Sequence, residues 1–331
     1  MSGLNLTKNS FSHIKKAPSC HNTSRVIKTE EQYTFARSDL AYESRTKLHG
    51  KDGDWLAAHG VAYSETCEDG VQAAILEIKT DEGAELVGKP KGRYVTAFCG
   101  RLRTLDEKSM DKVRASLAGH IRELARSLLG KKLSKEHSVL VVGLGNRDLT
   151  SDAIGPMTVD KMIVTRHIKD ADAALWDELG MCEVSAISPG VLGQTGIETL
   201  ELVRGAAKNV SPSLVIVIDA LAARSLDRLA CTVQLSDAGI EPGSGIGNGR
   251  KAMKSETVGF PVMSIGVPTV VDSSTLVYDA LARAGVEEIS DGLRAVLENG
   301  RGFFVSPKDS DLICDEVSTL LSEAINLAMS V

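Results

Sequence analysis

The chain has 331 residues, the length of one large domain with additions or of roughly two domains. Hydrophobic residues make up 43% and charged residues 25% of it, which excludes a disordered or fibrous protein. The longest apolar runs, such as residues 214–218, are far shorter than the ~20 residues of a membrane span. The formal net charge of −6 argues against a general nucleic-acid binder, because the surface of such a protein is basic.

The six cysteines are scattered and form no C-x-x-C pair, which is typical of a reducing cytoplasm. Residues 1–28 carry lysines and arginines but no apolar segment, so they do not form a secretory signal. Their Ser, Asn and Lys content indicates a flexible extension. We therefore expect a cytoplasmic protein that begins with a flexible tail.

The first regular patterns along the chain are two strands and a helix. Residues 71–78 and 93–99 alternate as strands do, and turn signals lie between them at 81–83 and 88–90. Residues 107–130 carry apolar side chains every three or four positions and end on a glycine, which predicts a long helix.

From residue 138 onward, short apolar strands alternate with helices. The expected strands are 138–143, 182–187, 214–218, 232–235 and 262–265, and the expected helices are 153–168, 196–208 and 310–329. This alternation predicts right-handed βαβ units and a mostly parallel sheet, the arrangement of an α/β fold.

A glycine pair follows the first of these strands. Gly143 and Gly145 begin like a dinucleotide-binding fingerprint, but Asp148 stands where the third glycine is required. A carboxylate at that position would repel a pyrophosphate. A nucleotide-binding protein is therefore a minor alternative.

Two aspartates follow expected strands at places where α/β sheets bind their ligands. Asp152 lies at the start of the helix expected from Ala153, and Asp219 ends the run 214–218. Each has an ordinary structural interpretation as well, a helix cap for the first and a turn for the second. If both face one crevice, they can share a proton, activate a water or share a metal.

Glycine-rich loops make up the remaining candidates. Residues 236–249 lack the G-K-[ST] ending of a phosphate loop, and their composition fits either a substrate-binding loop or a long surface turn. Two further loops, 188–196 and 266–270, look like tight strand-end loops. No G-x-S-x-G motif is present, and the histidines show no metal-ligand spacing.

Several motifs then combine into a recognisable order. They are RSDLAYE (37–43), VGLGN (142–146), TSDAIGP (150–156), TRH (165–167), PGV (189–191), TGIET (195–199), IDALAARS (218–225), PGSGIGN (242–248) and IGVPTVVD (265–272). Together they resemble the germination proteases of endospore-forming bacteria. The resemblance runs from about residue 32 to the C-terminal helix.

This resemblance implies a fold and an activity. The fold would be an α/β/α sandwich around a mostly parallel sheet with a smaller β-containing part, similar to hydrogenase maturation proteases. The expected division is 1–39 for a pro-segment, 40–106 for the smaller part and 107–331 for the catalytic core. The activity would be that of an endopeptidase that opens small acid-soluble spore proteins in the spore core. The family's members are tetramers made as zymogens. The acidic charge balance predicts no direct contact with nucleic acid.

The resemblance also assigns residues. Its two essential aspartates fall on Asp152 and Asp219. The bond between Asp39 and Leu40 has the acidic–apolar–small pattern of the family's cleavage sites, so we expect the zymogen to be cut there. Further residues fall on loops of the expected cleft: the substrate or oxyanion loop Gly243, Ser244, Gly245, Gly247 and Asn248, and the strand-end loop residues Asn146, Pro189, Gly190 and Thr269.

No counterpart of the metal-associated histidine of hydrogenase maturation proteases is evident, so we expect metal-free carboxylate catalysis without a cofactor. The alternatives are a metal-dependent maturation-type peptidase that uses the same carboxylates and a nucleotide-binding protein without hydrolytic activity.

Overall fold

A computed structural model describes residues 38–44, 48, 50–242, 250–286, 289–299 and 302–331. Within these residues, nine strands form one sheet in the order β1-β2-β3-β7-β8-β6-β4-β5, and β9 pairs with β8. The strands are β1 (Val61–Glu68), β2 (Val71–Ile78), β3 (Gly92–Phe98), β4 (Ser138–Gly143), β5 (Glu183–Ile187), β6 (Leu214–Ala223), β7 (Thr232–Ser236), β8 (Val262–Asp272) and β9 (Phe304–Val305).

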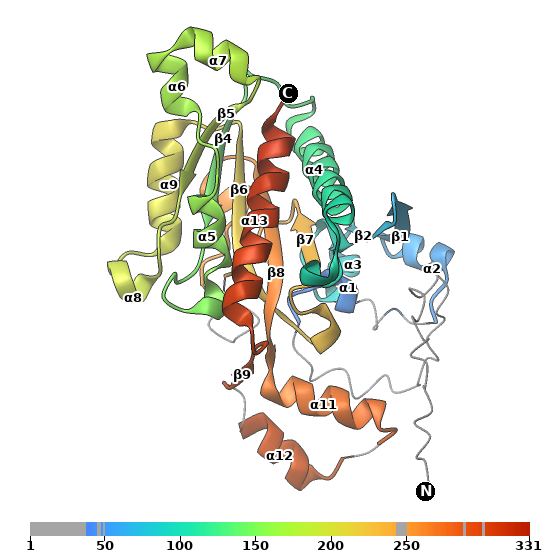
Figure 1. Ribbon diagram of the computed structural model, residues 1–331. Helices are drawn as coiled ribbons and strands as arrows, with labels where there is room; N and C mark the ends of the chain where they lie inside the picture. The colour runs from blue at the N-terminus through green and yellow to red at the C-terminus, as the bar shows by residue number, and fades with distance from the viewer. Residues whose placement is uncertain (1–37, 45–47, 49, 243–249, 287–288, 300–301) are drawn as a thin grey trace, which may run out of the picture.

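Helices cover both faces of this sheet (Figure 1). The α-helices are α1 (Ala41–Ser44), α2 (Gly53–Ala58), α3 (Asp81–Val87), α4 (Glu107–Leu129), α5 (Ile154–Asp160), α6 (Arg166–Ala171), α7 (Ala173–Leu179), α8 (Leu192–Thr195), α9 (Thr199–Val210), α10 (Ser255–Val258), α11 (Ser273–Arg283), α12 (Asp291–Asn299) and α13 (Ser310–Met329). Three short 3₁₀ helices are η3 (Leu102–Thr104), η4 (Thr150–Asp152) and η5 (Leu226–Arg228).

Side chains alternate between the two faces along the central strands, so each face packs against a different set of helices. In β6, Leu214, Ile216 and Ile218 pack with α4, α5 and α13 in the larger core. Val215 and Val217 point the other way and pack with α9 and α10. The expected α/β/α fold is confirmed, with a core built from aliphatic side chains.

The sheet has a parallel and an antiparallel half. Strands β8, β6, β4 and β5 are parallel neighbours, whereas β1, β2, β3, β7 and β8 pair antiparallel. Two antiparallel pairings separate β3 from β8, so β3 runs in the same direction as the parallel strands. The carboxyl ends of β3, β4, β5, β6 and β8 therefore meet at one edge of the sheet.

Two local predictions were wrong. The helix expected at 153–168 is interrupted, because Thr165 is fully buried and hydrogen-bonds to Cys182 and Val184 instead of continuing the helix. The turn expected at 81–83 is the first turn of α3, since the Thr80 side chain accepts a hydrogen bond from the Gly83 N–H and caps it.

Candidate active site

The sequence predicts that Asp219 ends a strand, and this prediction is wrong. It is the sixth residue of β6, which continues to Ala223 and pairs Asp219 with Gly266 of β8. The neighbour on the other side, β4, stops at Gly143 opposite Ile218. Asp219 is therefore the first residue of β6 beyond the end of β4, and it keeps a position at the carboxyl edge of the parallel strands.

Asp152 lies on η4, in the loop that follows β4. It is not the cap of α5, because Ala153 is the N-cap and makes no side-chain cap bond. Instead, the Asp152 carboxylate accepts a 2.8 Å hydrogen bond from the Asn146 N–H. Gly145 permits this turn: its φ is +113°, and a Cβ there would lie 1.9 Å from the Asp152 carbonyl oxygen. The loop is thus folded tightly onto the aspartate.

Neighbouring loops hold the Asp152 turn in place. The Thr269 hydroxyl on β8 donates a 2.6 Å hydrogen bond to the Ser151 carbonyl. The Gln194 amide on α8 donates to the Asn146 side chain at 2.9 Å. Pro189 and Gly190 precede α8, and Gly190 has a φ of +72°. Of the predicted loop residues, Asn146 and Thr269 contact the Asp152 turn, whereas Pro189 and Gly190 lie one loop away.

The two aspartates interact electrostatically. Burial raises the pKa of Asp219 well above its ordinary value, and the nearby charge of Asp152 raises it further. Asp219 is only 4% exposed, and the Ala220 N–H donates to it at 3.0 Å. Burial also raises the pKa of Asp152, although the hydrogen bond from Asn146 and the charge of Arg250 oppose that rise. Paired carboxyls with unequal pKa values are suited to acid–base chemistry.

The predicted cleavage site lies against the same strand. The Asp39 N–H donates to the Ala222 carbonyl of β6 at 2.8 Å, and the charge of Asp39 contributes to the raised pKa of Asp219. Leu40 is fully buried. The predicted oxyanion loop, Gly243 to Asn248, and residues 1–37 of the predicted pro-segment lie outside the described residues.

The two alternative activities can be compared with this geometry. The Asn146 N–H, which a pyrophosphate would need at the glycine loop, is bound by the Asp152 carboxylate. Among the described residues, His, Cys, Asp and Glu side chains form no group of three that could hold a metal ion. Within the same part of the chain, no helix is long and apolar enough to span a membrane.

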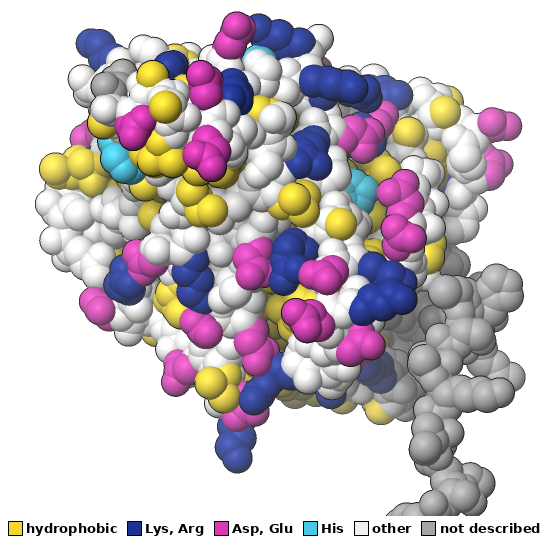
Figure 2. All heavy atoms as spheres, turned by 45° about the horizontal axis from the view of Figure 1, so that its top comes forward, with side chains coloured by type: hydrophobic (Ala, Val, Ile, Leu, Met, Phe, Trp, Pro, Cys, Tyr) yellow, Lys and Arg dark blue, Asp and Glu magenta, His cyan; other side chains and the backbone are white. Residues whose placement is uncertain are grey.

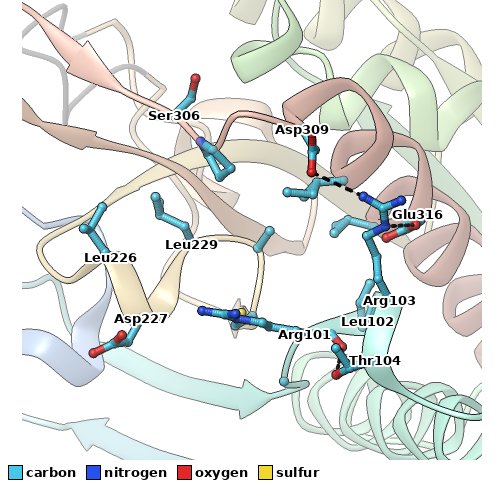
Figure 3. A pocket seen from close by; sticks show the side chains of 16 residues that line it. Arg101, Leu102, Arg103, Thr104, Leu226, Asp227, Leu229, Ser306, Asp309 and Glu316 are labelled. Carbon is cyan, nitrogen blue, oxygen red and sulfur yellow. Dashed lines mark hydrogen bonds and ion pairs between the residues drawn. The ribbon is translucent and has the colours of Figure 1, made fainter. Parts of the chain in front are cut away.

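A cavity of about 790 Å³ opens elsewhere on the carboxyl edge, between the loops after β3 and β6 and the start of α13 (Figure 3). Arg103 on its wall pairs with Asp309 and Glu316. Leu229 lines the cavity and also packs in the cluster that contains Leu40. Neither catalytic candidate lines it, so the aspartate site and this cavity are distinct.

The charge on one face of the molecule is mixed. On the face in Figure 2, lysine and arginine side chains are interspersed with aspartates and glutamates, without a large area of one sign. Cross-helix pairs such as Arg114–Glu323, between α4 and α13, also bring opposite charges together. This face offers no basic stripe for a nucleic-acid backbone.

Comparison with known proteins identifies the family. The family model described as germination protease matches residues 36–284, about three quarters of the chain. The chain belongs to the germination protease family. The germination protease of Caldanaerobacter subterraneus is 40% identical over 317 residues, covering 88% of this chain and 94% of that protein.

Other germination proteases are similarly close. That of Priestia megaterium is 42% identical over 253 residues, covering 76% of this chain and 67% of its own, and that of Clostridium acetobutylicum is 35% identical over 317 residues, covering 88% of this chain and 94% of its own. Among solved structures, a [NiFe] hydrogenase maturation protease from Thermococcus kodakarensis aligns over 60% of this chain and 94% of its own, with 15% identity and a TM-score of 0.34.

Proposed function

We propose that this chain is an endopeptidase that begins the degradation of small acid-soluble spore proteins during germination, in which Asp152 and Asp219 activate water. The observation that carries the proposal is the pair of carboxyls at the sheet edge, buried Asp219 and half-buried Asp152, in which the charge of Asp152 raises the pKa of Asp219. The membership in the germination protease family agrees with this activity. No cofactor is needed for the chemistry described below.

The two carboxyls differ in a way that supports a separate role for each. Burial and the charge of Asp152 raise the pKa of Asp219 well above its ordinary value, which favours its protonated form, so we assign Asp219 as the general acid. Asp152 accepts a backbone hydrogen bond that favours its charged form, so it is the general base. Asp152 removes a proton from water, the hydroxide attacks the scissile carbonyl, and Asp219 protonates the leaving amine.

We further propose that the protein is made as a zymogen in the forespore and cuts itself between Asp39 and Leu40. The support is the position of Asp39, which hydrogen-bonds to β6 three residues beyond Asp219. By resemblance to its family the enzyme assembles as a tetramer. Its net charge of −6 favours action on spore proteins released from DNA rather than direct binding to nucleic acid.

The direct test is incubation of the purified protein with a small acid-soluble spore protein, with and without a chelator, followed by mass mapping of the cut. We expect cleavage after an acidic residue in both conditions. Asp152→Asn and Asp219→Asn should each abolish it while the protein remains folded. Full activity in either variant contradicts the two-aspartate mechanism, and loss of activity with chelator supports a metal-dependent peptidase instead.

A further inference from the structure

The segment Ser38–Glu43 lies on the sheet as a bound peptide would. The Asp39 N–H donates to the Ala222 carbonyl, and the Ala222 N–H donates back to the Asp39 carboxylate, both at 2.8 Å. This pairing fixes the acidic residue that precedes the proposed cut. The backbone N–H of Ala222 thereby recognises an acidic side chain at this position.

The residues after the proposed cut are anchored separately. Leu40 is fully buried among Leu221, Leu229 and Val271. Three residues further, the two oxygens of Glu43 accept hydrogen bonds from the Arg224 and Ser225 N–H groups, at 2.7 and 3.0 Å. The peptide bond between Asp39 and Leu40 is therefore held from both sides.

Two side chains donate to the carbonyl oxygen of this bond. The Lys89 ammonium lies 3.0 Å from the Asp39 carbonyl oxygen, and the Gln234 amide nitrogen lies 3.4 Å from it. The other end of the Gln234 amide accepts from the Ala41 N–H at 2.6 Å, which fixes the orientation of its donor. Lys89 is placed by the αL turn at Gly88, which ends α3.

The register of the sheet relates these donors to the catalytic pair. Gln234 of β7 pairs with Gly266 of β8, and Gly266 pairs with Asp219 of β6. Side chains of register partners point to the same face, so Gln234 and Asp219 face one side, two strand spacings or about 10 Å apart. The residue between them, Gly266, has no side chain, and the Leu221 side chain packs over it.

We propose that Lys89 and Gln234 are catalytic residues that bind the oxyanion formed when the bond after Asp39 is hydrolysed. This inference rests on the proposed function and adds the groups that stabilise the oxyanion. The predicted loop at residues 243–249 is not required for it. Preorganised donors of this kind stabilise the charge that develops on the carbonyl oxygen.

Hydrolysis of the bond between Asp39 and Leu40 uses both aspartates and both donors. A water oxygen bonds to the Asp39 carbonyl carbon while one water proton passes to Asp152, and the carbonyl electrons move onto the oxygen held by Lys89 and Gln234. The oxyanion collapses, the C–N bond breaks, and Asp219 gives its proton to the Leu40 nitrogen. One water is consumed, and a carboxyl and an amine are formed.

The test compares isosteric variants of the full-length chain. Gln234→Glu keeps an acceptor for the Ala41 N–H but replaces the donor to the Asp39 carbonyl with a second acceptor, and Lys89→Met removes the charge. Each should slow self-cleavage about 100-fold, the usual effect of losing one oxyanion donor. Lys89→Arg should restore part of the rate. Lys91→Met, which removes an exposed lysine paired with Asp81, and Gln72→Glu on β2 should leave it unchanged.

A second readout separates catalysis from folding. Self-cleavage followed as a single turnover isolates the chemical step, so its rate constant in either variant should fall about 100-fold while the far-ultraviolet circular dichroism stays that of the unmodified protein. Thermal midpoints should match that of the unmodified protein. Self-cleavage within a few-fold of normal in both variants, or a loss that follows the thermal midpoint, overturns the inference. If Asp152→Asn and Asp219→Asn also cleave normally, the proposed function itself has failed.

Discussion

Replacing Asp219 by Asn should abolish cleavage and, at neutral pH, stabilise the fold. Asp219 is 4% exposed, and its raised pKa means that the folded protein holds its proton more tightly than the unfolded chain does. Below the unfolded pKa of about 3.9, Asp219 is protonated in both states, and its ionisation does not change the free energy of unfolding. Above it, unfolding releases the proton, and stability falls by about 1.4 kcal/mol per pH unit until the folded pKa is reached. Asn does not titrate, so this fall is absent from the variant.

The measurement is urea unfolding of both proteins between pH 4 and pH 7, with intact mass confirmed for each sample. The free energy of unfolding of Asp219→Asn, relative to the unmodified protein, should rise with pH and favour the variant by at least about 1 kcal/mol at pH 7. Asp54→Asn, on the exposed first turn of α2, is the matched control. A difference that does not change with pH would refute the buried, protonated state of Asp219.

Three further outcomes are expected. The pH profile of kcat should be bell-shaped. Activity should be lost as pH falls through the raised pKa of Asp152 and as pH rises through the raised pKa of Asp219. A profile without an alkaline limb contradicts the role of Asp219 as the acid. Gly145→Ala should destabilise the protein by about 1–3 kcal/mol and abolish cleavage, because its φ is +113° and its Cβ would meet the Asp152 carbonyl, whereas Gly119→Ala in α4 should stabilise by up to about 1 kcal/mol in the same unfolding assay. Glu43→Gln should slow self-cleavage about tenfold by weakening two charge-assisted hydrogen bonds, as followed by mass spectrometry, and an unchanged rate means that the anchor plays no part.

The fold class could be predicted from the sequence because it depends on local patterns. An apolar run such as 138–143 marks a strand covered on both faces, and α13 has the bounds expected for it. The strand lengths could not be predicted in the same way. β6 continues past Asp219 because β8 pairs with it up to Ala223, and such pairing is a property of the assembled sheet.

The same distinction applies to the site. Asp152 and Asp219 could be named because each follows an apolar run, although Asp152 does not cap α5 and Asp219 lies within β6 rather than at its end. Lys89 and Gln234 carry no local signal of a catalytic role: Lys89 lies in a turn after the glycine that caps α3, and Gln234 is a polar residue within a buried strand. Glu43 belongs to the RSDLAYE motif, but its anchoring role depends on the Arg224 and Ser225 N–H groups, 181 and 182 residues away.

The strand order has a consequence for biosynthesis. β8 lies between β6 and β7, so Asp219 and Gln234 are brought into register only by a strand that ends at Asp272. A chain still attached to the ribosome cannot present Asp39 to a complete site until that strand has emerged and inserted. In the proposed self-cleavage, the order of the strands would therefore keep Asp39 from a complete site until β8 has been translated.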